Sequence, residues 1–570
     1  MKHIKPIEIS SPFSKFLSDE MREAMPPPEY EVGGYFIEEV EMRDGAKLLT
    51  KVCVPDRGER WPCLFMRTPY EAYWEMGPAN AIPFIEQGYV VVIQYCRGTN
   101  GSDGEYKPFE NERNDGIDAI KWLSAQPWQD GNIGTFGASY MAFNQWVISD
   151  SLPPEVKTMY IDSGGADWYA AVYANGMFRH DCYTSWPVGN FGDKDNLEEV
   201  YRAALDTRPH NTMDERVLGR KIPYYQEFIK NTARSDLYWA DSYWRSTLEN
   251  PAKINVPICV VEGWFDHNVE SVMAGIRRLR PEIAKQCIFM FGPWDHIGQM
   301  PDDVLEYPDG DKFGPGRSLL MLSWFDRMLK GKKNELVSEY YAIGEGKWHT
   351  LDFFKPDTEK VTYYIGADKT LTGSHVENGE YRYEYDPAMP LYAIGGSDLM
   401  SWIGGIGFSD RGPQLQPEYS DRFDVLVFKT CPLPDSLLIK GSPVVSLEVI
   451  SSAPDTSFMV RLSEQFDDGR TVNIADSASS ILLRGESETI LKYTPGSKVV
   501  LTFRMCDIFW QLKKGSRLRL DISSSNFPMY HLHPNKVGIW SAIEDWDKAN
   551  QVVCYGSEKS AVYLPIMLNK

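Results

Sequence analysis

One serine stands in a sequence context that could activate it as a nucleophile. Ser139 follows Gly137 and an apolar strand-like run, and a helical pattern begins directly after it, in Asn-Ile-Gly-Thr-Phe-Gly-Ala-Ser-Tyr-Met-Ala at 132–142. A strand that turns sharply into a helix, with Gly two residues before Ser, is typical of a nucleophile elbow. Met141 replaces the second glycine of the G-x-S-x-G pattern, so the segment alone also fits an ordinary strand–helix junction.

A serine hydroxyl needs a histidine base and a carboxylate that orients this base. In hydrolases with such an elbow, the acid and then the histidine follow the serine, each after a strand. His296 stands just beyond the last apolar run of the α/β pattern, and Asp266 follows the preceding run. Asp295 is a poor partner because neighbouring side chains generally point apart, and His267 would leave no later acid at a strand end. Ser139, Asp266 and His296 are therefore the candidate catalytic triad.

The oxyanion of a tetrahedral intermediate needs hydrogen-bond donors. One candidate is the backbone N–H of Tyr140, the residue after the nucleophile. The second donor usually comes from the loop after the third strand, here Met-Arg-Thr-Pro-Tyr at 66–70, in which Tyr70 could offer its phenol hydroxyl. From spacing alone, an aromatic ring that packs over the site is an equally good interpretation of Tyr70.

The segments around these residues predict a parallel sheet with helices on both faces. Apolar strand-like runs alternate with helical patterns, which implies such a sheet. The runs lie at 62–66, 89–94, 132–136, 157–161, 257–262 and 286–291. Helical periodicity without strands fills the interval before 254, and apolar–polar alternation follows residue 357. We predict an α/β core with an inserted helical cap and a C-terminal β jelly roll, divided as an extended N-terminal arm at 1–34, a catalytic domain at 35–164 and 254–356, a cap at 165–253 and the jelly roll at 357–570.

Composition excludes several classes of function. The 570 residues carry 59 Lys plus Arg against 80 Asp plus Glu, a net charge of −21, which repels phosphate backbones and anionic lipid. We expect no nucleic-acid or membrane partner. The N-terminus has no apolar signal-like run, and nine cysteines without a C-x-x-C are typical of reduced core residues. These features predict a cytoplasmic protein.

Many short motifs occur in one order along the chain. They include Arg-Thr-Pro-Tyr at 67–70, Gln-Tyr-Cys-Arg-Gly at 94–98, Gly-Ala-Ser-Tyr at 137–140, Gly-Trp-Phe-Asp at 263–266, Gly-Pro-Trp-Asp-His at 292–296 and Ser-Ser-Asn-Phe-Pro at 524–528. With these motifs the chain resembles, from about residue 35 to 565, the cocaine-esterase-like CocE/NonD hydrolases. That family is related to X-Pro dipeptidyl-peptidases and α-amino-acid ester hydrolases.

The resemblance implies roles for individual residues. It implies Ser139 as nucleophile, Asp266 as orienting acid and His296 as base, with the Tyr70 hydroxyl and the Tyr140 amide as the oxyanion hole. It also implies an α/β-hydrolase core, a helical cap and a C-terminal jelly roll. The chain departs from the family at Ala142, where the family prefers glycine, and at Asn268, where the cocaine-esterase pattern has an aromatic residue.

Other signals concern the substrate and metals. We expect Tyr169 and Tyr173, at the start of the cap, and Asn268, after the acid, to line the acyl pocket. His531 and His533 could place two imidazoles on one face of a strand, but no third ligand is visible and the family has a surface loop there. We therefore predict no metal and no cofactor.

Together these features predict a serine hydrolase that cleaves a small-molecule carboxylic ester, or an amide, through an acyl-enzyme. Acyl transfer and amidase or peptidase activity on the same triad are the alternatives within enzymes. From another class, the chain could be a ligand- or carbohydrate-binding protein with a vestigial hydrolase core. The sequence does not name the substrate, and it leaves open whether the chain forms a dimer or tetramer.

Overall fold

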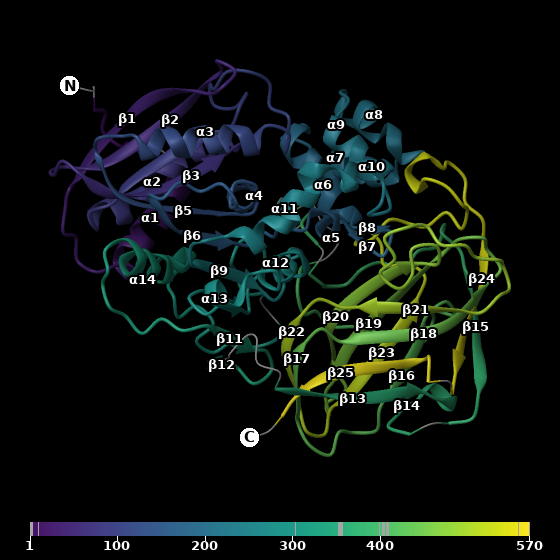
Figure 1. Ribbon diagram of the computed structural model, residues 1–570. Coiled ribbons are helices and arrows are strands. Elements are labelled where there is room, and N and C mark those ends of the chain that lie inside the picture. Colours follow the sequence, from purple (N-terminus) through teal and green to yellow (C-terminus); the bar gives the residue numbers. More distant parts are fainter. Residues whose placement is uncertain are drawn as a thin grey trace.

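The protein folds into an α/β body, a helical body beside it and a β body at the C-terminal end (Figure 1). A computed structural model describes residues 4–9, 11–301, 304–350, 357–374, 376–397, 399–401, 405, 410–556 and 558–568. The predicted domain boundary at residue 356 lies outside the described residues. In the described part of the chain, no helix combines the length and apolar character needed to cross a membrane.

A mixed sheet with parallel central strands forms the α/β body. From one edge to the other, its strands are β1 (Val32–Glu41), β2 (Lys47–Pro55), β4 (Val90–Tyr95), β3 (Trp61–Thr68), β5 (Gln129–Ala138), β6 (Val156–Asp162), β9 (Ile258–Gly263), β10 (Ile288–Gly292), β11 (Glu339–Ala342) and β12 (Lys347–Thr350). The pairs from β4 to β11 are parallel. The carboxyl ends of these strands therefore meet at one edge of the sheet.

Helices cover both faces of this sheet. In β4, Val91 and Ile93 pack into one apolar cluster while Val90 and Val92 pack into another on the opposite face, as strand alternation requires. One face carries α2 (Tyr73–Glu86) and α14 (Ser318–Leu329). The other carries α3 (Glu112–Ser124), α4 (Tyr140–Trp146), α12 (Val269–Ile276) and α13 (Pro281–Ala284). The predicted α/β-hydrolase core is confirmed.

The prediction of an extended N-terminal arm is wrong, because the segment contains helix α1 (Pro12–Ala24). The Ser11 side chain accepts a hydrogen bond from the Ser14 amide, and proline occupies the first turn, where its missing N–H costs no helical hydrogen bond. Leu17, Met21 and Met25 recur every four residues and pack beside α2 and α14. The polar residues between them obscured this narrow apolar stripe.

Helices fill most of the segment that was predicted as a cap. They are α5 (Trp168–Val172), α6 (His180–Phe191), α7 (Leu197–Asp206), α8 (Met213–Leu218), α9 (Pro223–Lys230), α10 (Leu237–Ala240) and α11 (Ser242–Glu249). A short hairpin of β7 (Tyr173–Ala174) and β8 (Met177–Phe178), which the helical periodicity did not indicate, lies between α5 and α6. Aromatic side chains form most of the cap interior.

The C-terminal body is built from two antiparallel sheets. One contains β13 (Thr358–Ile365), β14 (Leu371–Thr372), β15 (Gly379–Tyr385), β17 (Leu437–Gly441), β18 (Val444–Ser451), β21 (Val499–Arg504), β22 (Ile508–Leu512), β24 (Ala549–Tyr555) and β25 (Ala561–Met567). The other contains β16 (Leu426–Lys429), β19 (Ser457–Gln465), β20 (Thr471–Ser480) and β23 (Arg517–Ser523). Their inner faces share one apolar cluster, as in a β-sandwich.

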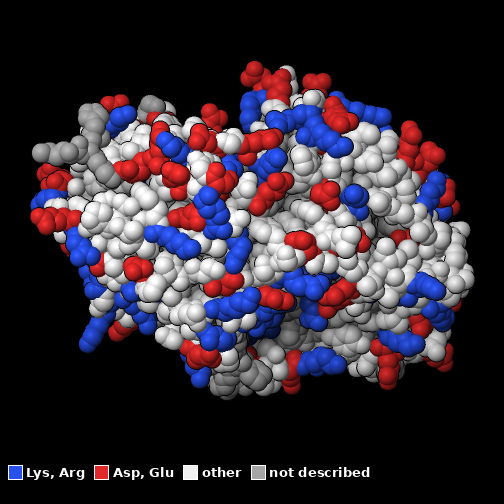
Figure 2. Space-filling view, turned by 45° about the horizontal axis from the view of Figure 1, so that its top comes forward, with Lys and Arg blue, Asp and Glu red and all other residues white. Residues whose placement is uncertain are grey.

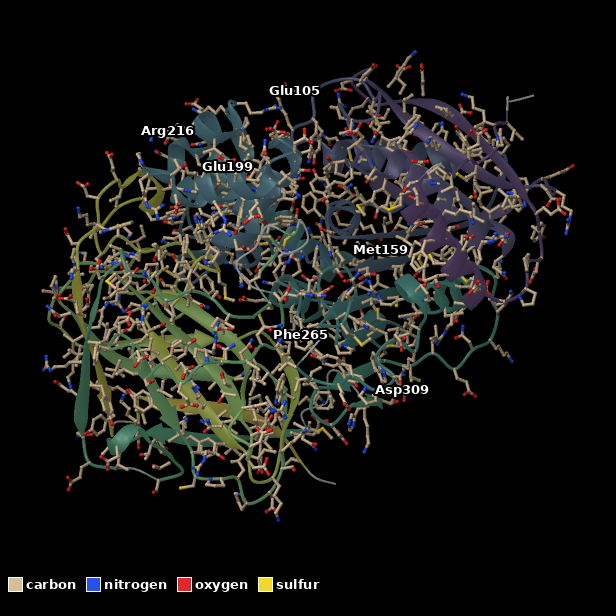
Figure 3. All side chains as sticks on the ribbon, turned by 180° about the vertical axis from the view of Figure 1, so that it is seen from behind. Glu105, Met159, Glu199, Arg216, Phe265 and Asp309 are labelled. Carbon is tan, nitrogen blue, oxygen red and sulfur yellow. The ribbon has the colours of Figure 1, made fainter. Side chains whose placement is uncertain are left out.

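Buried polar contacts join the C-terminal β body to the other two bodies. Asp181 of α6 accepts hydrogen bonds from the Met400 and Ser401 amides at 2.6 and 3.0 Å. Arg411 donates to Asp295, after β10, at 2.8 Å. Viewed from behind, Phe265 lies where the α/β body meets the β body (Figure 3). On the outer face shown in Figure 2, acidic and basic side chains are interspersed.

Replacing Asp181 should weaken the contact between the cap and the β body. Asp181→Ala leaves the half-buried Met400 amide and the amide and hydroxyl of the buried Ser401 without their acceptor, and the loss of a buried hydrogen bond costs about 1–3 kcal/mol. We expect the free energy of unfolding in urea to fall by at least about 3 kcal/mol. The exposed Asp195→Ala in the same cap is the control and should leave it within about 0.5 kcal/mol. Equal stability of the two variants would contradict this role.

Candidate active site

Ser139 occupies a strained turn between β5 and α4. Its backbone has φ 58° and ψ −122°, a conformation that residues with a side chain rarely adopt. Two residues earlier, Gly137 has φ +148°, and a Cβ there would lie 2.4 Å from the Cβ of Met141. Glycine is therefore required at 137, and the sharp turn is the geometry of a nucleophile elbow.

Ala142 departs from the family pattern. Gly164, in the connection that follows β6, leaves room for its methyl group. A Cβ at Gly164 would lie 2.8 Å from the Ala142 Cβ and 2.8 Å from the Ser139 carbonyl oxygen. Since Gly164 has no Cβ, the methyl group of Ala142 fits at the start of α4. The elbow is also held by the Ser139 amide, which donates to the Asp162 carbonyl at 3.1 Å.

The three candidate triad residues form a continuous hydrogen-bonded chain. His296 Nε2 lies 3.0 Å from Ser139 Oγ, and His296 Nδ1 lies 2.9 Å from Asp266 Oδ2. Ser139 follows β5, Asp266 follows β9 and His296 follows β10, so parallel strands of one sheet deliver all three to the same edge. This arrangement can remove a proton from the serine hydroxyl and hold the resulting imidazolium against a carboxylate.

Asp266, the acid of this hydrogen-bonded chain, is fully buried and is held in its charged form. Burial opposes the charge of Asp266, but His296 and His267 outweigh it and hold the pKa of Asp266 far below its usual range. Glu262, at the end of β9, has a pKa well above its usual range because of burial and the nearby charge of Asp266. Glu262 is therefore the protonated member of this carboxyl pair.

His296 has the electrostatic character of a base. Burial disfavours its imidazolium, but the charge of Asp266 and the hydrogen bond to it outweigh this cost and raise the pKa of His296. Deprotonated His296 is the form that accepts the Ser139 proton.

The two residues that sequence reasoning set aside lie beside the triad in different ways. The Asp295 side chain turns away, since it accepts hydrogen bonds from Arg411 and from the amides of Ile297 and Gln299. His267 Nδ1, in contrast, lies 3.1 Å from Asp266 Oδ1. Sequence reasoning missed this second imidazole on the acid, although its position directly after Asp266 was a signal.

Tyr70 lies beside Ser139, and Tyr140 follows Ser139 as the first residue of α4. Burial raises the pKa of Tyr70 to about 12, and hydrogen bonding to the side chains of Trp186 and Ser139 opposes this shift. The Tyr70 hydroxyl is therefore a protonated donor beside the nucleophile. The Tyr140 amide opens α4, where no intrahelical acceptor exists for it. The Trp186 and Tyr140 rings are stacked with centroids 6.2 Å apart.

The polar atoms of the residues expected to line an acyl pocket donate hydrogen bonds to backbone carbonyls. The Tyr169 hydroxyl donates to the Thr232 carbonyl at 2.9 Å, and the Tyr173 hydroxyl donates to the Phe228 carbonyl at 2.7 Å. Both rings lie in the cap interior. Asn268 is buried, and its side-chain amide donates to the Ser163 carbonyl at 3.1 Å. These contacts fix the cap and the loop that carries Asp266.

The buried His531 and His533 do not form a surface loop, which corrects the expectation drawn from the family. His531 Nδ1 accepts from the Phe178 amide, and His533 Nε2 lies 3.2 Å from Asp455. Among the described residues, the group with ligand atoms close enough to hold a metal is Asp266, His267 and His296. Because Asp266 and Ser139 already engage both nitrogens of His296, this group fits a triad better than a metal site.

Comparisons with known proteins agree with this geometry. Residues 44–298 match the family model of the X-Pro dipeptidyl-peptidases (S15 family), and residues 330–558 match the C-terminal non-catalytic domain of these enzymes. A cocaine esterase from Rhodococcus sp. (strain MB1 Bresler) is 28% identical over 579 residues, which cover 93% of this chain and 97% of that protein.

Two solved structures share the fold over almost the whole chain. An aminopeptidase from a marine sediment archaeon, Thaumarchaeota archaeon, has a TM-score of 0.80 at 20% identity and covers 95% of this chain and 98% of its own. An α-amino acid ester hydrolase has a TM-score of 0.78 at 21% identity and covers 93% and 96%. The chain is thus a hydrolase, and it belongs to the cocaine-esterase-like CocE/NonD family, which is related to the X-Pro dipeptidyl-peptidases.

Proposed function

We propose that this protein hydrolyses a carboxylic ester of a small molecule through an acyl-enzyme on Ser139. The observation that carries the proposal is the hydrogen-bonded chain from Ser139 Oγ through His296 to Asp266. A vestigial core in a ligand-binding protein would have no need to keep a strained serine, a charged buried acid and an oriented histidine together.

In the first half of the reaction, His296 Nε2 takes the hydroxyl proton as Ser139 Oγ attacks the ester carbonyl carbon. The Tyr70 hydroxyl and the Tyr140 amide donate to the oxyanion that forms. Collapse of this intermediate breaks the bond to the leaving alkoxide, which receives the proton from His296. Asp266 stabilises the transient imidazolium and remains charged.

In the second half, water replaces the alcohol. His296 removes a proton from the water as its oxygen attacks the acyl carbon, and it returns this proton to Ser139 Oγ when the acid leaves. An amine leaving group would follow the same path, so amide cleavage is the alternative on this triad. Transfer to another alcohol would require an acceptor that competes with water for the acyl-enzyme.

Aromatic rings on the cap side of the elbow support a substrate with an apolar part. Trp186 stacks on Tyr140 and contacts Tyr224 at 5.0 Å between ring centroids. Rings offer a large contact area at little cost in conformational entropy. The polar atoms of Tyr169, Tyr173 and Asn268 already bond to the protein backbone. We therefore propose that these three residues support the pocket wall and do not hydrogen-bond to the substrate.

Ser139→Ala should abolish turnover without unfolding the protein. The change removes one hydroxyl and leaves the hydrogen bond between His296 and Asp266 intact. We expect loss of ester hydrolysis and of covalent labelling by a fluorophosphonate, with an unchanged melting temperature. Ser149→Ala, which removes another buried hydroxyl close by, is the control and should retain both activities. Substantial turnover by Ser139→Ala would refute the proposal.

Tyr70→Phe should lower kcat far more than it changes KM. An oxyanion donor acts mainly in the transition state, and loss of one typically costs about 10²–10³ in rate. Tyr95→Phe removes a hydroxyl that bonds the Tyr73 carbonyl instead, and it should keep kcat near the wild-type value. Steady-state kinetics with 4-nitrophenyl acetate checks both, and a Tyr70→Phe rate within a few-fold of wild type would leave Tyr70 a packing role only.

The acid limb of the pH profile should lie above the usual range of a histidine. His296 must be neutral to act, and its pKa is raised above 6.5, so kcat/KM should fall as pH decreases through a midpoint above 6.5. In Asp266→Asn, the burial that lowers the pKa of His296 would be opposed only by the weaker effects of the Asp295 and Asp162 charges, and the residual activity should titrate at lower pH. A wild-type midpoint below 6.5, or an unmoved midpoint in the variant, would contradict this electrostatic account.

A further inference from the structure

The phenol of Tyr140 is held at both of its hydrogen-bonding positions. Its hydroxyl donates to Glu112 Oε1 at 3.0 Å and accepts from the Phe109 amide at 2.8 Å. Tyr140 is 2% exposed and Glu112 3% exposed, so water does not compete for these bonds. The amide of the same residue is a proposed oxyanion donor, which connects these bonds to the reaction.

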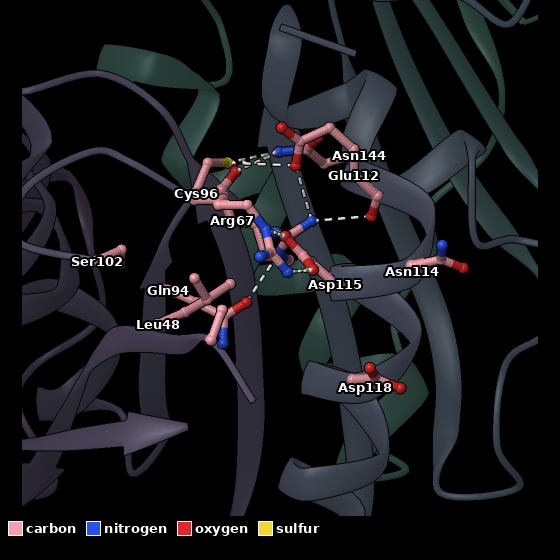
Figure 4. Close-up of polar contacts among 12 residues, drawn as sticks. Leu48, Arg67, Gln94, Cys96, Ser102, Glu112, Asn114, Asp115, Asp118 and Asn144 are labelled. Carbon is pink, nitrogen blue, oxygen red and sulfur yellow. Dashed lines mark hydrogen bonds and ion pairs between the residues drawn. The ribbon is translucent and has the colours of Figure 1, made fainter. Parts of the chain in front are cut away.

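Glu112 is itself fixed by a buried network behind the elbow (Figure 4). Its second oxygen, Oε2, accepts from Arg67 Nη1 at 2.9 Å and from Cys96 Sγ at 3.4 Å. Arg67 also donates to Gln94 Oε1 at 2.8 Å, and Asn144 of α4 donates to the Arg67 carbonyl at 3.0 Å. The network thus joins β3 and β4 to the helix that begins at Tyr140.

The pairing with Arg67 also removes an electrostatic objection. An isolated carboxylate behind the oxyanion hole would repel the negative charge that develops there. The Arg67 and Glu112 side chains are 2% and 3% exposed and form a close ion pair, so their fields largely cancel at a distance. Glu112 therefore influences the site mainly through its hydrogen bond with the Tyr140 phenol.

The other partner of the phenol, Phe109, is also enclosed by its surroundings. Its backbone has φ 73°, in the left-handed region, and its ring lies in the aromatic cluster of the cap, with a centroid 4.6 Å from that of Trp168. The Phe109 amide therefore points at the Tyr140 hydroxyl from a loop that both the cap and α3 hold.

We propose that Glu112, together with the Phe109 amide, positions the oxyanion hole by clamping the phenol of Tyr140. Ser139 holds the backbone of Tyr140 from one side, and the clamp holds the far end of its side chain, so the Tyr140 peptide plane keeps one orientation. Glu112 touches no reacting atom and acts through Tyr140. This inference rests on the proposed function, because it assumes that the Tyr140 amide serves as an oxyanion donor.

Loss of the clamp should act on the transition state rather than on substrate binding. A donor that is misplaced by about 1 Å can cost up to about a hundredfold in rate. Tyr140→Phe keeps the amide and the ring and removes only the clamped hydroxyl. We expect kcat for 4-nitrophenyl acetate to fall about tenfold to a hundredfold, with KM within twofold. The inhibition constant of phenylboronic acid, which places a negative oxygen in the hole, should rise by a similar factor.

A matched control separates positioning from a general loss of stability. Tyr383→Phe removes a buried hydroxyl that bonds Ser524 Oγ at 2.9 Å in the β body, far from the elbow. It should lower the melting temperature about as much as Tyr140→Phe and leave kcat and boronate inhibition unchanged. If Tyr140→Phe also leaves kcat and boronate inhibition unchanged, or if both variants lose activity in proportion to stability, the proposal is wrong.

The contribution of Glu112 is tested by Glu112→Gln. Tyr140 and Arg67 bind different oxygens of Glu112, and a glutamine places an acceptor oxygen at only one of these two positions. Glu112→Gln should therefore reproduce the kcat loss of Tyr140→Phe, and the double variant should be no worse than either. Wild-type kcat in folded Glu112→Gln would overturn the role of Glu112, and if this variant does not fold, the Tyr140→Phe result decides. Stoichiometric fluorophosphonate labelling at Ser139 in every variant shows that the proposed function holds even where the clamp fails.

Discussion

The structure around the site depends on one buried charge, the carboxylate of Asp266. An ionised carboxylate without solvent is stable only when donors surround it. His296 and the amide of Asn268 supply hydrogen bonds, and His267 lies against the same oxygen as that amide. Glu262 stays protonated beside it. Because the acid must be charged, the orientation of His296 and the geometry of the loop after β9 follow from it.

The elbow imposes the second constraint, since a strained backbone persists only where its surroundings hold it. Gly137 and Gly164 leave the room that the turn needs, and the Asp162 carbonyl binds the Ser139 amide. Behind the turn, the ion pair of Arg67 and Glu112 replaces the apolar packing found elsewhere under the sheet. Charged side chains therefore lie on both sides of the nucleophile, and each of them is paired with a side chain that balances its charge.

Much of this arrangement could be predicted from the sequence, because strand periodicity places residues at strand ends. The strand ends place Ser139, Asp266 and His296 at one edge of the sheet on the pattern of the sequence alone. It could not place His267, since the direction of a side chain after a strand depends on the loop. Nor could it place Tyr173, whose hydroxyl meets a carbonyl 55 residues later in the chain. Contacts of this kind depend on how the cap helices pack.

The ion pair between Asp295 and Arg411 has a consequence for how this protein can evolve. Asp295 directly precedes the histidine of the site, and its partner Arg411 lies between β15 and β16 of the C-terminal sandwich. The sandwich thus supplies a side chain that holds the loop carrying His296 in place. If recombination exchanged this part for a homologous one, the buried Asp295 would lose its ion-pair partner unless the incoming part brought a guanidinium to the same place.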